Sequence, residues 1–219
     1  MSASVTRPQD PPSTTHDELA RQLATLHRLG YPELAGRTGP ELDALVAPLR
    51  ERLEPRPVAP GSIPFVLVVA GRFVPTTEQV GRWSVGGRGG WTDMADELGG
   101  FRAIEGVDVP SGPVYLLEDV DTGASTLGVT PDDALPRVLA SGRTPLTIDE
   151  GVAVVTQFPQ VFTEHNAFQA LGSRAGNRRV PSFWVSKGAP RLGWCWAGNP
   201  HSWLGAASAG RRLGAAAPG

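Results

Sequence analysis

The sequence has little of the residue types that hold metals or form disulfides. Its 219 residues include a single cysteine, Cys195, and four histidines. One cysteine cannot form a disulfide within the chain, which favours a reducing compartment and predicts a cytoplasmic protein. The four histidines are scattered along the chain. Because they form no group with the spacing of metal ligands, we predict neither a metal site nor a cofactor.

The sequence also lacks an excess of either charge and any long apolar run. Its 20 basic residues stand against 22 acidic ones, whereas a nucleic-acid-binding protein normally has a basic excess or a basic stripe. No apolar run approaches the roughly eighteen residues that a membrane span requires. The N-terminus lacks the basic and then apolar pattern of a signal peptide. We therefore expect no nucleic-acid partner and no membrane partner, and the oligomeric state stays open.

The two ends of the chain differ from its middle in composition. Residues 1–16 are rich in proline, serine and threonine and are predicted to be disordered. Residues 17–56 contain two stretches with apolar residues at helical spacing and then a proline-rich linker, so they are predicted to form a helical arm. The narrow apolar stripe of this arm either docks on the main domain or contacts a partner protein. The tail, residues 211–219, has nothing to pack against and is predicted to be disordered.

Residues 60–210 combine strand and helix patterns and are predicted to form one α+β domain, an antiparallel sheet with helices packed on it. The valine-rich run "PFVLVVAG" predicts a buried strand, and a hairpin is predicted around the turn at Asp121–Gly123. Thr130 and Thr147 have the pattern of helix N-caps, and each predicts a helix that follows it. The glycine-rich "VGGRGGW" lacks the lysine and hydroxyl of a phosphate-binding loop and is predicted to be a flexible loop.

The segment "RLGWCWAGNPHSWLG", residues 191–205, contains three of the six tryptophans and the only cysteine. Its alternation, with turns at 187–190 and 198–201, predicts that the sheet ends in a three-stranded antiparallel meander. Counting through four-residue turns places Trp184 opposite Gly193 and Trp196 opposite Trp203.

The meander has two predicted faces. The core face carries Phe183, Val185, Leu192, Trp194, Trp196 and Trp203. The second face carries Trp184, which is either covered by a helix or exposed for binding.

Two residue pairs resemble catalytic pairs, and the meander argues against both. Cys195 lies in mid-strand while His201 lies about 10 Å away at the turn, too far for a nucleophile and its base. Ser186 and Lys187 are neighbours, so their side chains point to opposite faces of the strand. We therefore predict that Cys195 is buried and unreactive.

The turn at the His201 end is the candidate ligand-binding site. Two arginines, an imidazole and an amide meet at this turn in the predicted meander. Guanidinium groups bind carboxylate or phosphate with two hydrogen bonds, so these side chains suit a small anionic ligand. The alternative is that the same residues are solvated parts of a turn. The candidate residues are Arg178, Arg179, Trp196, Asn199, His201 and Trp203.

Three stretches together resemble a known family. They are "GPVYLLEDVDTGASTLGVTPDDALP", "RTPLTIDEGVAVVTQFP" and "GSRAGNRRVPSFWVSKGAPRLGWCWAGNPHSWLGAAS". Over about residues 100–209 the chain is similar to uncharacterised actinobacterial proteins that share a domain of unknown function. This resemblance implies no activity and no site residues.

The residue patterns leave two functions open. A non-catalytic binding or regulatory protein, with a protein partner or a small anionic ligand, fits the balanced charge and the lack of a nucleophile or metal cluster. The alternative is a small hydrolase or transferase with its site at Asn199 and His201. There the imidazole would titrate near neutral pH and the amide would donate to an oxyanion.

Overall fold

The computed structural model describes residues 14–161 and 167–215. Its helices are α1 (Thr15–Arg28), α2 (Tyr31–Leu34), α3 (Gly39–Arg52), α4 (Thr76–Gly81), α5 (Pro131–Ala140) and α6 (Ile148–Gln157). The fold is α+β, as predicted, and most strand pairs are antiparallel. None of the helices within the described ranges has the length and apolar character needed to span a membrane.

Two sheets form the framework. The first has the order β1 (Ile63–Val69), β6 (Val114–Val120), β14 (Arg211–Gly214). The second has the order β12 (Leu204–Ala206), β8 (Ala167–Gln169), β10 (Arg179–Ser186), β11 (Ala189–Trp196), β4 (Trp91–Thr92). Three short pairs complete the strands: β2 (Ser84–Val85) with β3 (Arg88–Gly89), β5 (Arg102–Ala103) with β9 (Ser173–Arg174), and β7 (Thr144–Pro145) with β13 (Ser208–Ala209).

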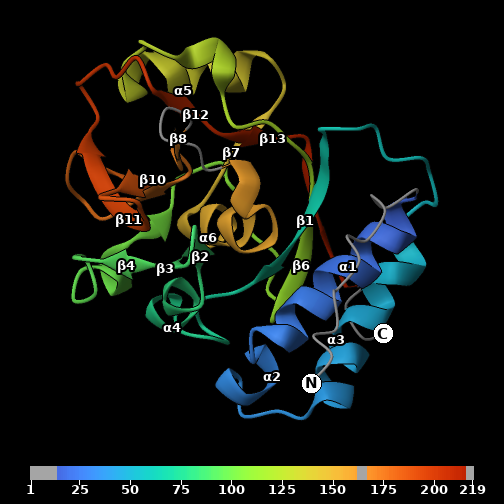
Figure 1. The fold of residues 1–219 in the computed structure, drawn as a ribbon. Coiled ribbons are helices and arrows are strands. Elements are labelled where there is room, and N and C mark those ends of the chain that lie inside the picture. The colour runs from blue at the N-terminus through green and yellow to red at the C-terminus, as the bar shows by residue number, and fades with distance from the viewer. Residues whose placement is uncertain (1–13, 162–166, 216–219) are drawn as a thin grey trace.

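Helices and sheets alternate in layers (Figure 1). Helices α1 and α3 cover one face of the first sheet, and α6 lies between its other face and the second sheet. Helix α5 covers part of the far face of the second sheet, where Ala134 and Val138 pack near Val180. Because α6 contacts both sheets, its buried residues surround it, as expected for a helix that is apolar on all sides.

The sequence of strand β1 is continuously apolar because both faces of the strand are covered. Phe65 and Leu67 face α1 and α3, whereas Val66 and Val68 face α6. Successive side chains of a strand point to opposite faces, so a strand that is covered on both sides has no polar position. The prediction of a buried strand here is confirmed.

The apolar stripe of the N-terminal arm docks on the first sheet, which confirms the first of the two alternatives for it. Leu26 and Leu49 are buried against β1 and β6. Gln22 pairs with the exposed edge of β1: its amide nitrogen donates to the Phe65 carbonyl at 2.9 Å, and its oxygen accepts from the Leu67 amide at 2.6 Å. The arm thus covers a strand edge whose backbone groups would otherwise lack partners.

Both predicted disordered ends need correction. Thr14 caps α1 in a capping box with Asp17, so helical structure already begins at Thr15. Residues 1–13 lie outside the described residues. In the tail, residues 211–214 form β14, which pairs with β6 and completes the first sheet. The low apolar content of this segment did not predict a strand, because the strand it pairs with, β6, is distant in the sequence.

A buried ion pair holds β14 in place. Arg212 donates from Nε to Glu150 Oε1 at 2.6 Å and from Nη2 to Oε2 at 2.8 Å. The same guanidinium donates to the Thr144 hydroxyl at 2.7 Å. Glu150 is fully buried, and it also accepts from the Thr147 amide at 2.7 Å, closing the capping box of α6. Burial raises the pKa of the neighbouring Tyr115, whose hydroxyl donates to Glu150.

The first hairpin of the predicted meander forms, with a different turn. Lys187 and Gly188 alone connect β10 and β11, with φ values of 54° and 76°. Positive φ at both positions is typical of the two-residue hairpin turn that matches the twist of the strands. The register therefore differs by two residues from the prediction, so Trp184 pairs with Arg191. A shift of two leaves each side chain on its predicted face.

The third strand of the meander is misplaced in the prediction. Strand β12 pairs in parallel with β8, on the opposite side of β10 from β11. Trp196 and Trp203 are therefore not cross-strand partners. The predicted hairpin after β6 is also wrong, because residues 124–126 form a short 3₁₀ turn and β6 pairs with β1 and β14 instead.

Because the Arg212–Glu150 pair is buried, we predict that removing Arg212 lowers the stability of the fold strongly. Replacing Arg212 with alanine leaves the buried Glu150 carboxylate without its cation, and we expect the free energy of unfolding to fall by about 3–5 kcal/mol. Urea unfolding followed by tryptophan fluorescence measures this change. The control is Arg178→Ala. Its ion pair with Asp132 is exposed on both sides, so we expect a loss of about 1 kcal/mol or less. Equal losses in the two variants would contradict the prediction.

Candidate functional site

The two arginines of the predicted anion site are already paired with carboxylates. Arg178 donates to Asp132 at 2.7 Å, and Arg179 forms an ion pair with Glu97. Arg179 also stacks on the Trp194 ring, with its guanidinium carbon 4.2 Å from the ring centroid. An anionic ligand at this turn would have to compete with both carboxylates. The structure therefore weakens the electrostatic argument for this site.

The remaining predicted site residues divide between the two faces of the second sheet. Trp196 lies beside Trp194 and Arg179 and is 45% exposed, so the prediction that it belongs to the core is wrong. Asn199 is exposed in the turn that follows. Trp203 lies on the other face, where its ring contacts Trp184 at a centroid distance of 6.3 Å.

His201 joins the same aromatic group as Trp203. Its ring lies 5.5 Å from that of Trp203, and its Nε2 is buried without a hydrogen-bond partner in the described part of the chain. Within the same residues, no group of three or more histidine, cysteine, aspartate or glutamate side chains has a metal-binding arrangement.

Trp184 is covered by side chains instead of by a helix. Its ring lies over Gly193, where an added Cβ would be 2.3 Å from the indole Cη2. Arg191 is held between Trp184 and Trp91, at 4.7 and 4.4 Å from the two ring centroids. The Arg191 guanidinium also pairs with Asp93 and lowers the pKa of that carboxyl. This arginine therefore attaches β4 to the sheet and has its charge neutralised.

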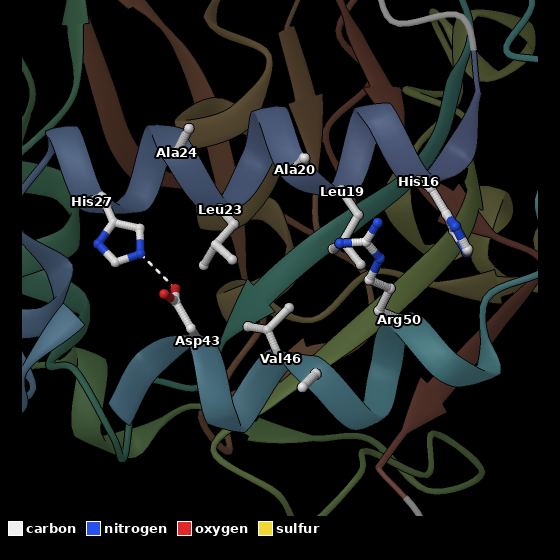
Figure 2. A pocket seen from close by; sticks show the side chains of 10 residues that line it. His16, Leu19, Ala20, Leu23, Ala24, His27, Asp43, Val46 and Arg50 are labelled. Atoms are coloured by element: carbon white, nitrogen blue, oxygen red, sulfur yellow. Dashed lines mark hydrogen bonds and ion pairs between the residues drawn. The ribbon is translucent and has the colours of Figure 1, made fainter. Parts of the chain in front are cut away.

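A shallow apolar groove runs between α1 and α3 (Figure 2). Its volume is about 480 Å³. The side chains of Leu23 and Val46 point toward each other across it, and the His27 Nε2–H donates to Asp43 Oδ1 at 2.7 Å at one end. The groove is what remains after the rest of the apolar stripe has docked on the first sheet.

A second cavity, of about 660 Å³, lies at the N-terminus of α6. The turn after β1, the start of α4, the loop at 95–103 and the first turn of α6 line it. Its size falls in the range of small-molecule sites in proteins. Its polar lining residues are Arg72, Thr76, Thr77, Arg102, Thr147, Asp149 and Ser173.

Asp149 is the acidic group in this cavity lining. The Gly71 amide donates to its Oδ2 at 2.8 Å, and the Thr76 hydroxyl donates to its Oδ1 at 3.4 Å. Burial raises the pKa of the carboxyl, and the nearby Glu150 charge acts in the same direction. The hydrogen bonds from Gly71 and Thr76 and the positive charge of Arg72 oppose this increase without cancelling it. Titratable groups with shifted pKa values gather at functional sites, although structural networks also produce them.

The two arginines of the cavity differ from those of the predicted site. Arg72 donates from Nη2 to the carbonyls of Pro110 and Gly112, and Arg102 donates from Nη1 to the carbonyls of Gly99 and Phe101. Across residues 14–161 and 167–215, neither arginine forms an ion pair with a carboxylate. Both side chains are exposed at the cavity. Their charges are therefore available to a ligand.

Sequence reasoning did not single out this cavity. Two signals were present: Gly71 and Arg72 directly follow a buried strand, and Asp149 lies two residues after the cap of α6. Residues at the ends of buried elements often carry function because a rigid scaffold positions them. Arg102 has no such signal, since only the fold brings it close.

The fold and this cavity define the class: an α+β protein with two sheets around a central helix and a ligand-sized cavity at the start of that helix. The chain belongs to DUF5701, a family of unknown function whose model matches residues 25–215. The expected resemblance to a family of unknown function is thus confirmed, over a longer range than residues 100–209. No curated protein and no solved structure matches the chain.

The environment of Cys195 predicts slow thiol chemistry. Its side chain is partly buried beside Ser182 and Gln169, and burial raises the pKa of the thiol above its usual value. Because the thiolate is the reactive form, we expect a maleimide or disulfide reagent at neutral pH to label the folded protein much more slowly than the urea-unfolded protein. The unfolded chain is the internal control. Equal rates in the two states would revive Cys195 as a candidate nucleophile.

Proposed function

We propose that this protein is a non-catalytic binding protein and that it binds a small ligand carrying an anionic group in the cavity at the N-terminus of α6. One observation carries the proposal. Arg72 and Arg102 line a cavity of suitable size without a carboxylate partner, while Arg178, Arg179 and Arg191 are each paired with one. Guanidinium groups bind carboxylate and phosphate well because their donors match these anions in geometry.

The proposal keeps the predicted class of function and ligand but moves the site. It also includes a cytoplasmic location, which is supported by the single cysteine. The hydrolase or transferase alternative required His201 as a base. In the described residues the His201 ring packs on Trp203 and has no hydrogen bond to a carboxylate that would orient it, so no observation favours that alternative.

Anion binding is tested by substitution at the two competing sites. The probes are acetate, succinate and inorganic phosphate, and the readout is isothermal titration calorimetry of the full chain. A lost charge-assisted hydrogen bond is worth about 1.5–3 kcal/mol, so we expect Arg72→Gln and Arg102→Gln each to weaken binding of the best probe by about tenfold or more.

The matched controls are Arg178→Gln and Arg179→Gln at the sequence-predicted site. We expect them to leave the affinity within about twofold of the original chain, because their charges already pair with Asp132 and Glu97. If Arg178→Gln and Arg179→Gln weaken binding while Arg72→Gln and Arg102→Gln do not, the anion site lies at the His201 turn instead. No binding of any probe at about 10 mM would contradict the proposed function.

A further inference from the structure

The cavity at the N-terminus of α6 presents charges of both signs at different depths. Asp149 lies in the first turn of the helix and is partly buried. Arg72 and Arg102 are exposed, and they come from the turn after β1 and from β5. A ligand that fills the cavity therefore meets an anion in one part and cations in another.

The Asp149 carboxylate has room for another hydrogen-bond donor. A carboxylate offers about four acceptor positions, and the two hydrogen bonds to Asp149, from Gly71 and Thr76, use one on each oxygen. Burial penalises its charged form, neither hydrogen bond supplies a positive charge, and the nearby charge of Arg72 compensates only in part, so the pKa of the carboxyl stays raised. A cationic donor within the cavity would stabilise the ionised carboxylate.

Gly71 keeps this carboxylate in its position. An added Cβ at residue 71 would lie 2.7 Å from Asp149 Oδ1 and 2.7 Å from the Thr76 hydroxyl oxygen. Contacts that short do not occur, so any side chain at this position would displace Asp149. The close approach also lets the Gly71 amide donate to Asp149 Oδ2.

A ligand with one sign of charge would be only partly complementary to this arrangement. A simple anion at Arg72 and Arg102 gains nothing from Asp149 and is repelled by it. A simple cation at Asp149 meets the opposite problem at the arginines. Specific recognition favours ligands whose charges match those of the site at each point.

We infer that the ligand is a small zwitterion of the amino-acid class, with its ammonium group at Asp149 and its carboxylate at Arg72 and Arg102. The ammonium group supplies three donors and a positive charge in direct contact with Asp149, in addition to the more distant charge of Arg72. The inference rests on the proposed function, because it assigns the anionic end of the ligand to the same two arginines.

The experiment measures how binding depends on the distance between the two ligand charges. The probes are glycine, β-alanine, γ-aminobutyrate and ε-aminocaproate, each compared with the acid and the amine of the same chain length. Calorimetry of the full chain gives the affinities. We expect at least one amino acid to bind about tenfold more tightly than its matched acid and its matched amine. The chain length that binds best then reports the span between Asp149 and the arginines.

Substitution of Asp149 isolates the ammonium contact. Asp149→Asn keeps an oxygen for the Gly71 amide and removes the charge, so we expect the tenfold advantage of the amino acid over its acid to disappear. The affinity for the acid should stay the same or rise. The control is Asp132→Asn, an exposed carboxylate paired with Arg178, which should change neither affinity. Should Asp149→Asn fail to fold, Asp149→Glu, which moves the charge by one methylene, is expected to shift the preference to a different chain length.

The outcomes separate the inference from the proposed function. If an acid binds as tightly as every amino acid of the series, and Arg72→Gln weakens it, the inference fails while anion binding at the arginines stands. If Asp149→Asn leaves the advantage of the amino acid intact, the inference also fails. If no acid, amine or amino acid binds, both the inference and the proposed function are overturned.

Discussion

The interaction on which the rest of the structure depends is the contact between Glu150 and Arg212. Glu150 closes the capping box of α6 through the Thr147 amide, and its carboxylate receives two hydrogen bonds from Arg212 on β14. A buried carboxylate is costly unless it is paired and hydrogen-bonded. This pair therefore fixes three things together: where α6 begins, where the last strand joins the first sheet, and which way the preceding residue, Asp149, points. The same turn of helix that completes the fold also presents Asp149 to the cavity.

Helix α6 can take this central place because its sequence is almost entirely apolar after its first turn. Val152 and Val154 pack in the core between the two sheets, and Gly151 allows the Phe183 ring to approach, since an added Cβ would lie 2.4 Å from that ring. A helix enclosed in this way has little freedom to tilt or slide, because well-packed interiors resist small displacements. Groups attached to its N-terminus are then held as rigidly as the core. A binding site gains from such support, because fewer degrees of freedom are lost when the ligand binds.

Local sequence signals predicted much of this fold. Three local signals were each sufficient to predict their element: the apolar run of β1, the caps at Thr130 and Thr147, and the apolar stripe of the N-terminal arm. Each of these elements is determined by a few neighbouring residues. The failures share the opposite property. Strand β14, the parallel pairing of β12 with β8, and the two-residue turn at Lys187 depend on partners or backbone angles that periodicity does not encode. The candidate site failed in the same way. Arg178 and Arg179 stood out as neighbouring cations, but Asp132 and Glu97, which neutralise them, are far away in the sequence.

The arginines show how charge becomes available for binding in a chain with almost no net charge. Most of the cations that the structure describes on the second sheet are used to attach segments: Arg191 holds the segment of Asp93, and Arg179 holds that of Glu97. Such pairs at a surface contribute little stability, but they fix the position of a loop. The loop at 95–103 that these pairs help to position carries Arg102 into the cavity lining. Paired arginines on the sheet thus support an unpaired one at the cavity, and it is this unpaired charge, in a cavity that the Asp149 carboxylate also lines, that has free energy to gain from a ligand.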